Sequence, residues 1–216
     1  MSARVEMLKD VAVTETSAAW YGRLTRYAGW LAIGLGFLTL LPTFGADPAW
    51  GAFLIVVGLI AQRVSPPTAL ALYSVMLGWA GLINGLFGRQ SMAGALFLAA
   101  LITVLACIGA YRSGLRVWPT APALAWGSLA LACTGALTLI VAFGGSLLAF
   151  FTGWYFDARV ADYLAAAGVH QSVLAVGLAI GAAIQPSSPR WAALLGAVGA
   201  LTGILAYLTL LLLAQG

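Results

Sequence analysis

Apolar residues lie in seven long blocks along the chain, separated by short breaks that contain proline or polar residues. A helix needs about 20 mostly apolar residues to cross a membrane, with a range of about 17–25. The pattern therefore predicts an all-α, polytopic transmembrane bundle of about seven spans in one domain, residues 27–214. The expected spans are 27–44, 49–64, 68–87, 92–111, 123–151, 169–184 and 191–214. A six-span bundle, in which one of the short blocks is re-entrant or interfacial, is the alternative.

Composition excludes a soluble protein. Of the 216 residues, 62% are hydrophobic and 7% are charged, whereas a soluble domain has about 45–50% apolar and about 25% charged residues. The connections between the blocks are short, which leaves no room for a separate soluble domain. We therefore expect any function to lie within the bundle or at its rims.

The basic residues predict an orientation. With the N-terminus inside, eight of the ten basic residues face the cytoplasm and only Arg89 and Arg159 face outward. Cytoplasmic loops of membrane proteins carry an excess of Lys and Arg. Seven spans place the termini on opposite sides, so we expect a cytoplasmic N-terminus and an outer C-terminus.

Residues 1–26 have mixed charge and precede the first apolar block, so we expect an uncleaved cytoplasmic tail. The net charge of +4 is interpreted as orientation and contact with the lipid bilayer, without any nucleic-acid partner. The bias toward Ala, Gly and Leu is typical of bacterial chains. The expected location is the cell membrane, specifically a bacterial inner membrane.

Small residues one helical turn apart occur on three blocks. The pairs are Gly81 and Gly85, Gly177 and Gly181, and Gly199 and Gly203. Such pairs let helix backbones approach closely within a membrane. We interpret them as internal packing positions, and self-association or contact with other membrane subunits is the alternative.

Polar residues inside the blocks are few. No Asp, Glu or Lys lies in the interior of any block, so buried carboxylates for proton or cation coupling are absent from the predicted spans. Asn84 lies near the outer end of the third block, and the Ser and Thr hydroxyls are expected to bond the carbonyl one turn back. Residues 144–146 (Gly-Gly-Ser) are the candidate for a broken helix.

One outer segment, residues 154–172, contains Asp157, Arg159, Asp162 and the only histidine, His170. Its apolar residues recur at helical spacing, which predicts an interfacial amphipathic helix with Asp157 near its start. The two carboxylates and the histidine could bind a cation or sense pH between about 5 and 8. A solvated surface helix with local Asp–Arg pairing is the favoured interpretation, because a five-residue spacing does not place Asp157 and Asp162 on one face.

Catalytic and cofactor signatures are absent from the sequence. There is no HExxH, GxSxG or Walker sequence, and Cys107 and Cys133 have no histidine or second cysteine at ligand spacing. We expect no enzyme activity, no metal and no cofactor.

Three segments resemble the Bax-inhibitor (YccA-like) family of small seven-span membrane proteins. SPPTALALYSVMLGWAGL, with Tyr73 five residues before Gly78, resembles that family's third span. LITVLACIGAYRSGLRVW, with Tyr111 and Arg112, resembles the end of its fourth span, and LLGAVGALTGILAYLTLLLL is similar to its last span. The resemblance implies a seven-span fold and a pH-sensitive calcium leak. The acidic pair that gates such a leak would fall at Ala182 and Gly203, so this chain lacks it.

Two functions from different classes fit these features. The first is an accessory subunit or stress-related regulator that acts by helix packing within a membrane complex. The alternative is a channel or transporter for an ion or small solute, including a Bax-inhibitor-like leak. A carrier should contain a polar cavity, whereas a packing subunit should have a filled core and an exposed face of small residues.

Overall fold

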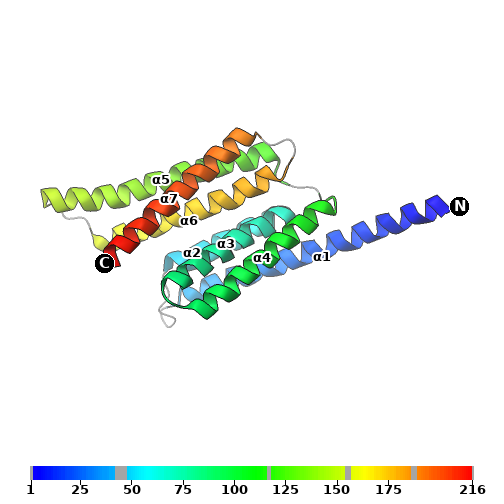
Figure 1. The fold of residues 1–216 in the computed structure, drawn as a ribbon, viewed down its shortest axis with the longest axis horizontal. Coiled ribbons are helices and arrows are strands. Elements are labelled where there is room, and N and C mark those ends of the chain that lie inside the picture. The colour runs from blue at the N-terminus through cyan, green and yellow to red at the C-terminus, as the bar shows by residue number, and fades with distance from the viewer. Residues whose placement is uncertain (1, 42–47, 116–117, 154–156, 186–188, 216) are drawn as a thin grey trace.

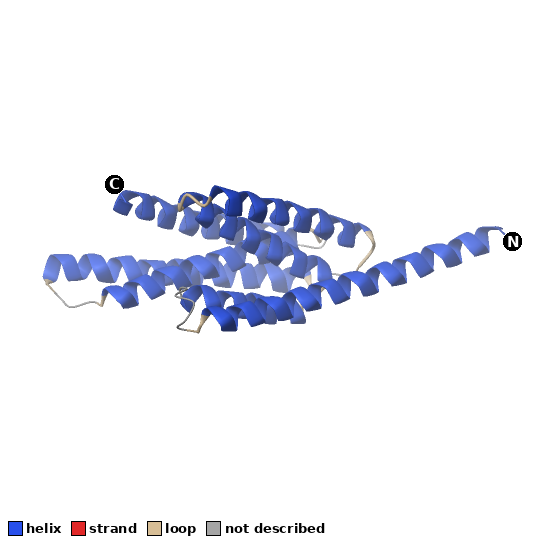
Figure 2. Ribbon diagram, turned by 90° about the horizontal axis from the view of Figure 1, so that it is seen from below, coloured by secondary structure: helices blue, strands red, loops and turns tan. Residues whose placement is uncertain are grey.

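The computed structural model describes residues 2–41, 48–115, 118–153, 157–185 and 189–215, and all regular secondary structure in these ranges is helical. In chain order the helices are α1 (Ser2–Thr39), α2 (Pro48–Arg63), α3 (Pro66–Leu86), α4 (Gln90–Arg112), α5 (Ala121–Thr152), α6 (Ala158–Ala183) and α7 (Arg190–Gln215). The helices are arranged as two adjacent groups, α1 to α4 in one and α5 to α7 in the other (Figure 1), and the long axis of α1 extends away from them (Figure 2).

Five helices are long and apolar enough to cross a membrane: α3, α4, α5, α6 from Arg159, and α7 to Thr209. The shorter α2 is also apolar, with 16 residues. The chain is therefore a helical, multi-pass membrane protein. Proline marks several helix starts, because it removes a backbone donor that the first turn does not need. Ser65 is extended and Pro66 begins α3, whereas Gly153 adopts a left-handed conformation (φ 67°) and ends α5.

Two helices, α6 and α1, begin well before the expected spans, and a third, α5, lacks the candidate break. α6 is one continuous helix from Ala158. The sequence analysis predicted an amphipathic segment separate from the sixth block, and this separation is wrong. α1 is likewise continuous from Ser2 through the predicted tail and into the first block, and it ends at Thr39 rather than at residue 44. α5 runs unbroken past residues 144–146, and the Ser146 hydroxyl donates to the Ala142 carbonyl at 2.8 Å. The predicted helix break at residues 144–146 is therefore wrong.

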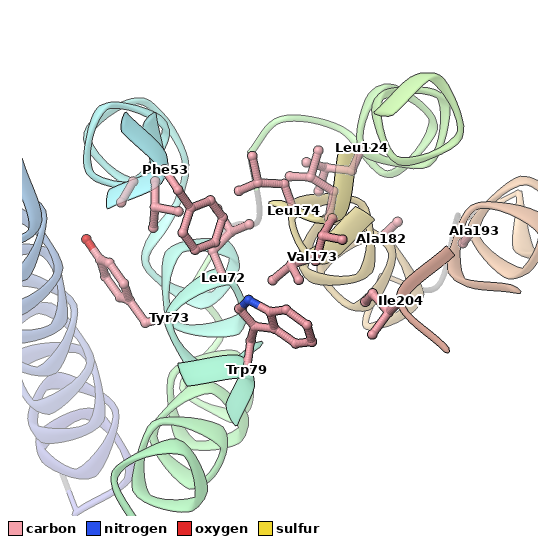
Figure 3. Close-up of a cluster of buried hydrophobic side chains, with 14 of the residues drawn as sticks. Phe53, Leu72, Tyr73, Trp79, Leu124, Val173, Leu174, Ala182, Ala193 and Ile204 are labelled. Atoms are coloured by element: carbon pink, nitrogen blue, oxygen red, sulfur yellow. The ribbon is translucent and has the colours of Figure 1, made fainter. Parts of the chain in front are cut away.

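The strongest packing joins helices that are neighbours in sequence, namely α1 with α2, α3 with α4, and α5 with α6. α7 packs back onto both α5 and α6, and α3 against α6 is the main contact between the two groups. The central core follows this contact: Figure 3 shows Trp79 of α3 and Phe53 of α2 pointing toward α6, with Ile204 of α7 close to Trp79.

Each of the six predicted packing glycines lies at a contact between helices of this chain. An added Cβ at Gly177 would lie 2.7 Å from Leu72 Cδ2, and one at Gly181 would lie 3.2 Å from Thr68 Cγ2, both on α3. Gly81 and Gly85 face Phe97 and Ala93 of α4, Gly199 faces Ala132 of α5, and Gly203 faces Ser172 of α6.

Two contacts that bring helix backbones together involve glycines that the sequence analysis did not single out. Gly36 and Gly51 meet between α1 and α2, where an added Cβ on either would lie within 2.9 Å of the other's carbonyl oxygen. Gly135 and Gly168 meet in the same way between α5 and α6, with 2.9 Å on both sides. A seven-residue spacing in each of two neighbouring blocks (Gly29 and Gly36, Gly51 and Gly58) is the signal that could have revealed the first contact.

Most of the membrane hydroxyls bond their own helix, as predicted. Thr103, Thr134, Thr138, Thr202 and Thr209 each donate to a carbonyl three or four residues earlier. Ser128 is different, because its hydroxyl donates across the α5–α6 contact to the Ala175 carbonyl at 2.8 Å. This hydroxyl therefore links two helices.

Candidate functional site

A cavity of about 1020 Å³ lies where the C-terminal half of α3 faces α6, and α1, α2, α4 and α7 complete its wall. Small-molecule pockets in proteins usually measure about 300–1,000 Å³ and are mostly apolar, with a few polar groups. This cavity has the same character. Its polar side chains are Asn84, Arg89, His170 and Tyr207, and the rest of its lining is apolar or tryptophan.

Asn84 belongs to the last turn of α3 and is partly buried. Its Nδ2 donates to the Ala80 carbonyl one turn earlier at 2.9 Å, which fixes the side chain along its own helix. A primary amide carries two N–H donors, so a second remains for another acceptor. The sequence analysis singled out Asn84 as a polar residue near the end of the third apolar block, and the structure places it in the cavity wall.

His170 is held between aromatic rings of α2. Its imidazole stacks on Phe53 with ring centroids 4.5 Å apart and planes 15° apart, and it lies 5.5 Å from the Trp50 ring. Because α6 begins at Ala158, His170 lies about 18 Å along the helix from its start, at 1.5 Å per residue. His170 is therefore part of the bundle and of the cavity wall, rather than part of a surface loop.

Arg89 lies in the turn between α3 and α4, at the cap position before Gln90. It is exposed, and it makes no ion pair within the part of the chain that the structure describes. Arg89 is also the one charged residue that lines the cavity. The cavity consequently has a positive charge at its rim.

Asp157 and Asp162 do not join this site. The Asp157 carboxylate caps α6 by accepting a hydrogen bond from the Arg159 backbone N–H at 2.9 Å, so its predicted place at a helix start is confirmed. Asp162 is exposed, and eight residues of helix separate it from His170 by about 12 Å along the axis. Across the described ranges, no three His, Cys, Asp or Glu side chains are grouped for a metal ion.

The aromatic residues of the wall were not predicted as part of a site. The sequence analysis gave no role to Trp79, which lines the cavity, or to Phe53, which stacks on the lining residue His170, and both are buried. Trp79 lines the cavity from α3 and Trp50 lines it from α2. A signal was present, because Phe53 and Trp50 lie three residues apart on one helical face, but their partner His170 is far away in the sequence.

A second hollow, of about 270 Å³, lies between α6 and α7 near their connection. Alanines of both helices line it, together with Ile180, Leu194 and Arg190. It is smaller and contains a single polar side chain. The larger cavity therefore remains the candidate site.

Comparisons of this chain with protein-family models, with curated proteins and with solved structures find no match.

Proposed function

We propose that this protein takes a small, largely apolar solute with a polar end into the larger cavity, as a binding protein or carrier without catalytic chemistry. The cavity itself supports this proposal: about 1020 Å³ of space that brings Asn84, Arg89 and His170 together among aromatic walls. The six glycines expected on packing faces contact other helices of the same chain. A packing subunit should expose a face of small residues, so the use of these glycines inside the bundle favours a carrier.

The proposal includes a seven-span arrangement in a bacterial inner membrane, with the N-terminus in the cytoplasm and the C-terminus outside. Two helices in addition to the five long apolar ones are needed for this arrangement, and α1 and α2 supply them. The lining residues Trp50, Asn84 and Arg89 then lie toward the outer side. Reporter fusions at the α3–α4 turn and at the C-terminus test this orientation, which a cytoplasmic signal at either position would contradict.

Two neighbouring alanines of α6 offer a matched test of the cavity. Ala166 lines the cavity and Ala167 does not, although both are partly buried. The full chain in detergent should be stabilised thermally by members of a panel of small apolar solutes (indole, benzoate and short-chain alcohols), because a ligand that binds only the folded state raises stability. Ala166→Phe should remove at least nine-tenths of this shift, whereas Ala167→Phe should retain it.

Flux across liposomes separates binding from transport. A carrier should move the stabilising solute at least ten times faster than empty liposomes do, and Ala166→Phe should abolish the difference. Calcium and protons belong in the same panel, because the resemblance to the Bax-inhibitor family implies a calcium leak. A panel in which no solute stabilises the protein and none crosses would contradict the proposed function.

A second candidate is an accessory subunit or stress-related regulator of a membrane complex. The length of α1 favours it, since 38 residues at 1.5 Å each span about 57 Å, against about 30 Å for the hydrocarbon core. Figure 1 shows the first half of α1 extending beyond the other helices, where it can meet a partner. Native purification tests this candidate, and a protein that always purifies alone would contradict it.

A further inference from the structure

The lining of the cavity changes from polar to apolar side chains along α3. Arg89 and Asn84 lie at the end where α3 meets α4, while Met76 and Leu77 line the opposite end. Along α3 the lining runs from Met76 to Phe87, eleven residues and therefore about 16 Å. A ligand that fits this lining has a polar head and an apolar body of comparable length.

The length of the cavity along α3 matches the thickness of the hydrocarbon layer of one leaflet. The hydrocarbon core is about 30 Å thick, so one leaflet contributes about 15 Å. The charged rim lies at a turn between two helices that are long enough to cross the membrane, which is where head groups lie. The cavity therefore extends from the head-group level toward the bilayer centre.

The cavity is accessible from the side. Phe87 and Met92 line it and are 58% and 52% exposed, so this edge is open to the surroundings of the bundle. α4 packs mainly on α3, and α7 packs on α5 and α6, so these two helices flank the cavity without forming a major contact with each other. An apolar molecule already dissolved in the bilayer can enter along this edge.

The charge at the rim selects the head group. Arg89 has no ion-pair partner within the described residues, and a guanidinium binds phosphate through two parallel hydrogen bonds. Asn84 has an N–H to spare beside it. A zwitterionic head group also carries a phosphate, but its own cation offsets that charge, so an anionic head group compensates the arginine better.

We propose that the cavity holds one anionic phospholipid, taken from the leaflet that contains the α3–α4 turn. Its phosphate lies at Arg89 and Asn84, and one acyl chain follows α3 down to Met76. This inference rests on the proposed function, because it names the class of molecule that the cavity takes. The size supports a lipid over an ion or a metabolite, since about 1020 Å³ is at the upper end of small-molecule pockets.

Native mass spectrometry of the full chain, released from detergent with equal amounts of phosphatidylglycerol, phosphatidylcholine and palmitate, tests the inference. The unsubstituted protein should retain one phosphatidylglycerol at least five times more often than phosphatidylcholine. Arg89→Gln should remove this preference, and Arg89→Lys should restore about half of it because the charge returns without the bidentate geometry. The matched control is Arg159→Gln, the other outer arginine, which lies outside the cavity and should change nothing.

Two outcomes overturn the inference without touching the proposed function. One is an unchanged lipid preference in Arg89→Gln while Ala166→Phe still blocks the solute panel. The other is retention of palmitate in place of phosphatidylglycerol, which would identify a fatty acid as the ligand. If Ala166→Phe alters neither lipid retention nor solute stabilisation, the cavity binds nothing and both proposals fail.

Discussion

The two halves of the α3–α6 contact differ in a way that explains where the cavity lies. In one half, Gly177 and Gly181 of α6 lie against Leu72 and Thr68 of α3, and the helices meet closely enough that an added Cβ would contact the opposite helix. In the other half, the residues at the same interface are Trp79 and His170, and a cavity lies beside them.

The difference shows that side-chain size sets the separation of helices within this bundle. Helix association in a membrane depends on close backbone approach rather than on the hydrophobic effect. Glycine permits that approach, and large rings prevent it. The half of the contact at Gly177 and Gly181 is therefore closed, and the half at Trp79 and His170 is open. The residues that make this difference lie only one or two turns apart on the same helices.

The largest expected effect on the free energy of unfolding comes from removing the ring of Trp79, which supports the open half of the α3–α6 contact. Trp79 is 7% exposed, and Trp79→Ala should lower the free energy of unfolding by about 3 kcal/mol, the lower end of the usual range for buried aromatic truncations. The lower end applies because part of the ring borders the cavity. Denaturation in mixed micelles measures this loss, and Trp30→Ala is the control because Trp30 is 65% exposed. Equal losses in the two variants would contradict a supporting role for Trp79.

A substitution in the closed half should have a smaller effect. Gly177→Leu adds a side chain where even a Cβ lies 2.7 Å from Leu72 Cδ2, and overpacking of this kind costs about 1–3 kcal/mol. Gly94→Leu on α4 is the matched control, since nothing lies within 4 Å of its added Cβ. Thermal unfolding should separate the two variants by several degrees. If both variants melt together, close approach at Gly177 does not stabilise the closed half.

The smallest effect concerns the hydroxyl that links α5 to α6. Ser128 is fully buried, and Ser128→Ala should cost about 0.6 kcal/mol, the average for hydrogen bonds between membrane helices. Thr134→Val removes a hydroxyl that bonds only its own helix and should cost less. The same unfolding assay compares them, and a greater loss in Thr134→Val would show that the bond between the helices contributes nothing.

The sequence predicted the helices well and the site only in part. α2, α3, α4, α5 and α7 begin and end within two residues of the expected spans, because proline, glycine and charged residues stop the apolar blocks. The starts of α1 and α6 were missed, since hydropathy locates the part of a helix that can lie in lipid and does not detect a helix that continues beyond it. The expected span 169–184 already contained His170, and the continuity of α6 joins that span to the segment that begins at Ala158.

The cavity could not be predicted from local pattern. Asn84 was selected because it is a polar residue in an apolar block, and it does line the cavity. Its neighbours there come from six helices, and only the packing of α3 against α6 decides which of them share a space. The two aspartates were grouped with His170 by sequence distance alone, and a straight helix separates them from it.

The pairing of sequence neighbours has a consequence for how the chain enters the membrane. Each of the first three helix pairs can form its main contacts as soon as its second helix has left the ribosome, because the partner is already present. Contacts between neighbours in sequence cost little loop-closure entropy and form early. The last helix has no such partner and must insert beside a finished hairpin, so truncation before Arg190 should leave α5 and α6 paired but uncovered on the face that α7 occupies.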